Sequence, residues 1–209
     1  ETKVGVVFRG DKYVSRRESR RRGIVSEARY AAVLGDVTEF GKELRSVLSV
    51  ERADEAGRVM WLGDGSPWIW NLAEAQCPGA TQVLDPGHAV EKGMNCAKKL
   101  LGESSPWLPL WKERLEHLLW SDNVDTLIEE LVECATLTNR DGKKAVNDLI
   151  RYYRNNQCRM HYAEHVASGL PVGSGYVESA HRHVLQTRMK RAGQHWGTCQ
   201  ARRMVKLRA

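Results

Sequence analysis

The sequence predicts an α/β fold in which strands come early and helices predominate later. Three observations favour this class. Val4, Val6 and Phe8 alternate with polar or small residues, as in a half-buried strand. Residues 59–62 form a short apolar run that predicts a central, buried strand. After Pro86 the pattern becomes helical and more polar, without any strand signal for some 70 residues.

The first elements follow from local patterns. Residues 28–34 offer a second strand that could pair with the first as a hairpin. Residues 36–48 carry apolar side chains at helical spacing, with Asp36 as the expected N-cap and Glu39 three residues on. The central strand then ends at Asp64. A helix is expected from Pro67 to about residue 76, because proline suits the first turn, followed by a short strand over 81–85.

The middle of the chain predicts an all-helical insertion. Helical segments are expected over 98–101, 111–120, 124–137 and 145–155, with breaks near 102–106 and 139–142. The chain then offers a turn at 173–175, a helix over about 176–192, a break at Gly193 and a short basic helix over 201–209.

Length and composition suit one globular domain, or one domain that carries an insertion. The chain has 209 residues, 42% of them hydrophobic, and no apolar run long enough to cross a bilayer. Its start lacks the organisation of a signal peptide. Five cysteines, an odd number without a Cys-x-x-Cys pair, favour reduced thiols. A cytoplasmic protein is therefore expected.

Positive charge is concentrated at the carboxyl-terminal end. Residues 151–209 contain 11 Lys and Arg against two acids, Glu164 and Glu178, whereas the net charge of the whole chain is only +6. Five further arginines lie within residues 16–22, where a hairpin tip is expected. Such clusters can be solvated surface, but two separate basic regions favour a polyanionic partner, most simply nucleic acid.

Two acids are candidates for chemistry, and each has a structural alternative. Asp64 lies where a buried strand turns into a helix, which suits a catalytic carboxylate and equally a helix cap. Glu178 follows a Gly-Ser-Gly turn at the start of a basic helix. A carboxylate there would repel phosphate unless a divalent metal lay between them. It could instead stabilise the helix N-terminus and pair with Arg182 at i,i+4.

A set of motifs in fixed order carries a family resemblance. The motifs are Thr2-Lys-Val-Gly-Val-Val-Phe8, Gly63-Asp-Gly-Ser-Pro-Trp-Ile-Trp-Asn-Leu-Ala73, Pro78-Gly-Ala80, Leu84-Asp-Pro-Gly-His88, Tyr153-Arg-Asn-Asn156, Gly169-Leu-Pro-Val-Gly-Ser-Gly-Tyr-Val-Glu-Ser179, Arg188-Met-Lys-Arg-Ala-Gly193 and Trp196. Together they resemble bacterial insertion-sequence transposases of the ISKra group, which are relatives of the Mutator-like DDE transposases. The resemblance runs through nearly the whole chain.

The resemblance implies an RNase H-like mixed sheet with flanking helices and an all-α insertion between the second and third catalytic acids. Residues 1–101 would form the first part of the core, 102–168 the insertion, and 169–209 the last part of the core with its basic surface. Asp64 matches the second catalytic aspartate and Glu178 the final glutamate, and these two would bind metal. Asp85 and His88 match the Asp-x-x-His motif that lies between them.

Two Mg²⁺ or Mn²⁺ ions are expected as cofactors, since paired ions can activate a water and stabilise the leaving 3′-oxygen. DNA, both as element ends and as target, is the expected partner, with no membrane partner. A homodimer or higher assembly is expected because two element ends must meet. Contacts to phosphate are expected from a basic set near the carboxyl end, with Trp196 as a candidate for stacking on a base: Arg182, Arg188, Lys190, Arg191, Arg202, Arg203 and Lys206.

The first catalytic aspartate of the family has no counterpart. In the family it lies on a strand upstream of the segment that matches residues 2–5, and this chain begins at Glu1. We therefore expect either a fragment of a longer protein or an incomplete triad. Three functions stay open: a transposase catalytic domain, a non-catalytic DNA-binding remnant, and a metal-dependent nuclease without strand transfer. In each case a bacterial cytoplasmic protein, associated with the nucleoid when bound to DNA, is expected.

Overall fold

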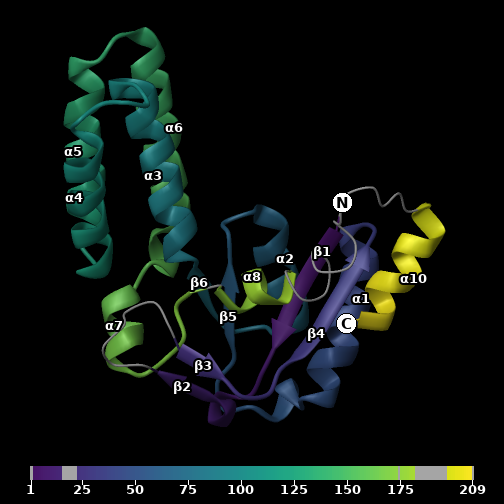
Figure 1. Ribbon diagram of the computed structural model, residues 1–209. Coiled ribbons are helices and arrows are strands. Elements are labelled where there is room, and N and C mark those ends of the chain that lie inside the picture. Colours follow the sequence, from purple (N-terminus) through teal and green to yellow (C-terminus); the bar gives the residue numbers. More distant parts are fainter. Residues whose placement is uncertain (1, 16–22, 174, 182–196, 209) are drawn as a thin grey trace. The chain divides into compact units, whose positions relative to one another are not determined.

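A computed structural model shows a mixed α/β protein that is mostly helical and has small sheets. The structure describes residues 2–15, 23–173, 175–181 and 197–208 (Figure 1). The chain divides into two compact units. The first comprises residues 1–60, 67–80 and 173–209, and the second comprises 61–66 and 81–172. The helix that follows residue 85, which we expected with the first part of the core, therefore lies in the second unit.

The first unit is built on two antiparallel strands, β1 (Thr2–Val7) and β4 (Arg29–Leu34). The expected hairpin partners are thus confirmed. Ala31 and Ala32 on β4 are both buried, although successive side chains of a strand point to opposite faces. Both faces must therefore be covered. Helix α1 (Val37–Val50) and helix α10 (Thr198–Arg208) both pack on β4, and Val205 of α10 forms a buried cluster with Ala32.

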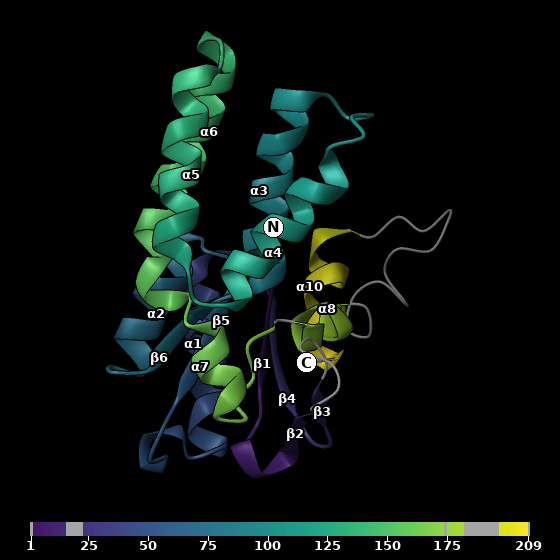
Figure 2. The same ribbon diagram turned by 90° about the vertical axis from the view of Figure 1, so that its left-hand side faces the viewer.

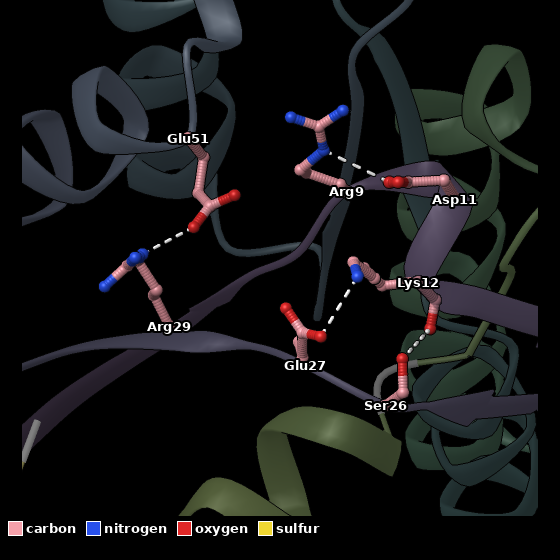
Figure 3. Close-up of polar contacts among 7 residues, drawn as sticks. All are labelled: Arg9, Asp11, Lys12, Ser26, Glu27, Arg29 and Glu51. Atoms are coloured by element: carbon pink, nitrogen blue, oxygen red, sulfur yellow. Dashed lines mark hydrogen bonds and ion pairs between the residues drawn. The ribbon is translucent and has the colours of Figure 1, made fainter.

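A second, shorter hairpin interrupts the connection between β1 and β4. Strands β2 (Tyr13–Ser15) and β3 (Gly23–Val25) pair antiparallel, after the 3₁₀ turn η1 (Gly10–Lys12). The arginine cluster that we expected at a hairpin tip, residues 16–22, lies outside the described residues. Surface ion pairs lie beside the hairpin, among them Lys12 with Glu27, and Arg29 with Glu51 (Figure 3).

Helix α1 begins where the sequence predicts, because the side chain of Asp36 accepts a hydrogen bond of 2.8 Å from the backbone N–H of Glu39. Helix α2 (Pro67–Gln76) has the predicted bounds and packs on α1, where the Gln76 side chain donates to the carbonyl of Gly41 at 2.6 Å. The 3₁₀ turn η2 (Ala53–Glu55) follows α1.

Helix α8 (Gly175–His181) packs on β1 through an aromatic cluster. The ring of Tyr176 meets the ring of Phe8 edge-on at 5.3 Å, and it meets the ring of Tyr13 at 6.1 Å. Gly23 lies against the same rings, since a Cβ there would come within 2.1 Å of the Tyr13 ring. The short hairpin and α8 are thus held together by aromatic packing.

The second unit contains a two-stranded sheet of β5 (Met60–Gly63) and β6 (Thr81–Leu84). The backbone N–H of Asp85 donates to the carbonyl of Gly63 at 2.7 Å. Because the last residue of β5 thereby bonds to the residue directly after β6, the carboxyl ends of the two strands lie side by side, as in a parallel pair.

Four helices of the second unit form a bundle: α3 (Pro86–Leu101), α4 (Leu108–Trp120), α5 (Val124–Leu137) and α6 (Arg140–Asn156). Each packs against the next, and α6 returns to α3 (Figure 1). Short connections make the neighbours antiparallel. At one end Tyr153 donates to the carbonyl of Ala89 at 2.9 Å, and at the other Gly142 lies against Leu100, so α6 runs opposite to α3.

The bundle is followed by the 3₁₀ turn η3 (Gln157–Arg159) and helix α7 (Tyr162–Ala167). The carboxylate of Asp122, in the turn between α4 and α5, accepts from the backbone N–H groups of Ala163 and Glu164 at 2.9 and 3.1 Å. It thus satisfies two of the donors that a helix N-terminus leaves without an internal partner.

The described strands form three separate pairs. The single mixed sheet that an RNase H-like fold requires is therefore not assembled among them, and the RNase H-like arrangement stays a prediction. Within the described ranges, no helix is both long enough and apolar enough to cross a membrane.

Candidate catalytic and metal-binding site

Asp64 lies directly after β5, in a tight turn. Its Oδ1 atom accepts a hydrogen bond of 2.8 Å from the backbone N–H of Ser66, and the side chain is half-buried. Gly65 has a φ of +94°, a conformation that favours glycine. The other carboxylate oxygen of Asp64, Oδ2, has no hydrogen-bond partner among the described residues. One oxygen thus holds the turn, and the other can take a ligand.

Asp85 lies directly after β6 and caps helix α3. Its Oδ1 atom accepts from the backbone N–H of His88 at 2.9 Å, and its side chain is only 8% exposed. The Nδ1 atom of the His88 ring lies 3.1 Å from the same oxygen. The short Asp-x-x-His spacing therefore lets one carboxylate cap the helix and orient the imidazole that follows it by three residues.

The carboxylate of Asp85 changes the pKa of the His88 imidazole. The hydrogen bond to Asp85 raises the pKa of His88 above its ordinary value of 6.5, and the negative charges of Asp85, Asp64 and Glu91 act in the same direction, although burial opposes them. His88 therefore keeps its proton to a higher pH than a free histidine does.

Tyr152, near the end of α6, is a member of this site that the sequence did not indicate. Its O–H donates to the backbone carbonyl of Asp64 at 3.3 Å, although 88 residues separate the two. A Cβ at Gly65 would lie 3.0 Å from the Tyr152 ring, so the ring packs against the turn. Burial raises the pKa of Tyr152, and its hydroxyl stays protonated. The only available signal was an aromatic pair, Tyr152 and Tyr153, on a helical pattern, which does not reveal what either ring contacts.

These contacts bring Asp64, Asp85 and His88 to one edge of the short sheet in the second unit. Carboxylate oxygens are the ligands that Mg²⁺ prefers, and Mg²⁺ is commonly held by one or two carboxylates with water completing its shell. Asp64 fits that requirement through Oδ2. Among the described residues, however, no group of three or more His, Cys, Asp or Glu side chains could hold a metal.

The other predicted site residues lie on α8, on α10 or outside the described residues. Glu178 belongs to α8, in the first unit, where the structure describes its backbone but not its side chain. On α10, the Arg202 Nε atom donates to the carbonyl of Leu34 at 3.0 Å, and Arg203 is exposed. The Lys206 side chain is not described. The remaining expected DNA contacts lie outside the described residues: Arg182, Arg188, Lys190, Arg191 and Trp196.

Comparison of the chain with models of protein families, with curated proteins and with solved structures found no significant match in any of the three.

Proposed function

We propose that the chain is the catalytic domain of a DNA transposase that cuts phosphodiester bonds at the ends of an insertion sequence and joins them to target DNA. The observation that carries the proposal is the edge at which Asp64, Asp85 and His88 meet. Two carboxylates and a histidine of raised pKa suit metal-assisted phosphoryl transfer. The sequence resemblance to ISKra-group transposases supports the same chemistry.

In this proposal Asp64 is the metal ligand within the second unit, and Glu178 is the further ligand that the resemblance assigns. Bound Mg²⁺ or Mn²⁺ would supply activation of a water and stabilisation of the leaving 3′-oxygen. Asp85 is a positioning residue, since it fixes the ring of His88. His88 carries a proton near the scissile phosphate, and Tyr152 holds the turn that presents Asp64.

DNA binding is proposed for the basic carboxyl-terminal end. Arg202 and Arg203 on α10 would contact phosphates, together with the basic residues of 182–191. Because such contacts release counterions, the affinity should fall steeply as salt rises and should depend little on sequence.

The proposal is tested by metal-dependent cleavage of a duplex that carries the element end. The protein is assayed as this chain and within any longer natural polypeptide that contains it, with Mg²⁺ or Mn²⁺. Asp64→Asn should abolish cutting, whereas the control Asp54→Asn, an exposed acid in η2, should cut as the wild type does. Binding of Mn²⁺, counted by electron paramagnetic resonance, should fall in Asp64→Asn and not in the control.

The products separate the alternatives. Joined strands support a transposase, and cutting without joining supports a nuclease instead. If every form of the protein binds DNA in a salt-dependent way but none cuts it and none binds Mn²⁺, the catalytic proposal is refuted and a DNA-binding remnant is the better account.

A further inference from the structure

Exposed apolar side chains gather on the helical bundle, away from the proposed site. Eight large hydrophobic residues are exposed in the part of the chain that the structure describes, and five of them lie on α3, α4 and α5 or in the loop that joins α3 to α4. Four of the five define what we call the apolar tip: Leu101 (40% exposed), Trp107 (64%), Leu110 (59%) and Leu137 (87%). Single exposed apolar residues are common, but a group of them marks an interaction site.

The register of the helices puts these residues at one level. Gly93 on α3 lies against Leu115 on α4. Since the two helices are antiparallel, eight residues forward from Gly93 reach Leu101 at the end of α3, and eight residues back from Leu115 reach Trp107, directly before α4.

The register of α4 and α5 places Leu137 of α5 at the same level as Trp107. Arg114 on α4 bonds to Glu130 on α5, with 3.1 Å between Arg114 Nε and Glu130 Oε1. Seven residues back from Arg114 reach Trp107, and seven residues forward from Glu130 reach Leu137. The α3–α4 and α5–α6 connections accordingly lie at the same end of the bundle (Figure 1, Figure 2).

Charges around the apolar tip are divided by sign. The α3 and α6 helices, which pack against each other, carry mainly exposed basic residues near this end: Lys98, Lys99, Arg140, Lys143 and Lys144, with Asp141 as the exception. The α4 and α5 helices with the loop before α4 carry three exposed acids there, Glu103, Glu113 and Glu133. The two exposed bases of this stretch, Lys112 and Arg114, pair with Glu116 and Glu130 of the same two helices. The apolar tip is therefore flanked by a basic side, on α3 and α6, and by an acidic side, on α4 and α5.

We propose that the apolar tip binds the apolar tip of a second copy of this chain in a two-fold dimer. A two-fold contact uses the same surface on both partners, so the basic side of one copy can face the acidic side of the other. Nucleic acid or an anionic membrane would meet repulsion from the acidic side. This contact needs neither DNA nor metal, and it therefore stands apart from the proposed transposase activity.

The first test is sedimentation of the full chain over a range of concentrations, without DNA or metal. The mass should rise from 23.7 kDa towards twice that value as concentration increases. Trp107→Ser with Leu110→Ser should raise the dissociation constant at least about tenfold, because exposed tryptophan commonly anchors interfaces. The control Val50→Ser, at an equally exposed apolar residue (59%) on α1, should leave it within about twofold.

A charge exchange tests the orientation. Glu113→Lys with Glu133→Lys, and separately Lys98→Glu with Lys143→Glu, should each lose self-association, while an equimolar mixture of the two variants should regain it. Far-ultraviolet circular dichroism checks that each variant is folded. A wild type that stays monomeric at every concentration, an equal loss in Val50→Ser, or a mixture that fails to associate would each overturn the proposal.

Discussion

The turn at Gly65 provides a sharp test of how the Asp64 site is built. Gly65 has a φ of +94°, and a Cβ added there would lie 3.0 Å from the Leu84 side chain and 3.0 Å from both the ring and the hydroxyl of Tyr152. Gly65→Ala therefore combines backbone strain with overpacking. Gly169 serves as a control in the same unit, since its φ is +70° and a Cβ there would meet nothing within 4 Å.

The expected magnitudes follow from these two terms. Backbone strain of this kind costs roughly 1–3 kcal/mol at either glycine. Overpacking adds typically about 1–3 kcal/mol, and it applies at Gly65 alone. Gly65→Ala should therefore lower the free energy of unfolding by about 1–3 kcal/mol more than Gly169→Ala does.

Urea unfolding followed by circular dichroism measures the difference. With equal slopes, the midpoint of Gly65→Ala should be the lower of the two. Replacing Tyr152 by leucine in the Gly65→Ala background should recover part of the excess, because a leucine side chain leaves more room beside the turn. If the two alanine variants unfold at the same urea concentration, the packing of Tyr152 and Leu84 against this turn has been misjudged.

Three further predictions concern the pKa of His88, the core of the helical bundle and the aromatic cluster at Gly23. Asp85→Asn keeps a capping side chain but removes the charge, so the pKa of His88 should fall, as followed by NMR titration. The stability that protonated His88 adds is fully present below its unfolded pKa of about 6.5, and it is lost as pH rises through the raised folded pKa. Asp85→Asn should therefore make the free energy of unfolding fall less steeply above pH 6.5. An unchanged pKa of His88 in this variant would contradict the role given to Asp85. Leu119→Ala, at a fully buried residue, should cost about 2–5 kcal/mol in urea unfolding, whereas Leu137→Ala, 87% exposed, should change stability by less than about 0.5 kcal/mol, and similar losses would count against the bundle core. Gly23→Ala should disturb the near-ultraviolet circular dichroism of the tyrosines, since its Cβ would reach the Tyr13 ring, while Gly10→Ala, with open space around it, should not.

Local signals in the sequence foretold much of the fold. The cap at Asp36 and the bounds of α2 could be predicted because a capping side chain and an N-terminal proline act within one helical turn. Helix α6 was expected to begin near residue 145, with a break at 139–142. Gly142 instead lies in its first turn, because Asn139 accepts a hydrogen bond from its backbone N–H at 2.9 Å. Strands β2 and β3 were not predicted, since three residues are too few to show an alternation.

The candidate site was only partly foreseeable. Asp64 could be chosen from its position after an apolar strand, and Asp85 from the Asp-x-x-His motif of the resemblance, but their shared edge depends on the pairing of β5 with β6. Tyr152 could not be chosen, because its contact with Asp64 crosses 88 residues and depends on how the bundle folds back. Sequence patterns predict which face of a helix or strand is buried, but they do not predict which distant helix or strand packs on that face.

The division of the chain into its two units has a consequence for folding during synthesis. The helical bundle is continuous in sequence, and its helices contact their neighbours along the chain, so it can form as soon as residues 81–172 have left the ribosome. The first unit is discontinuous, because β4 is covered by α10. Strand β4 is made early, yet its buried Ala32 must wait for Val205 to be translated. A pause in translation before α10 would therefore leave one face of β4 open to chaperones.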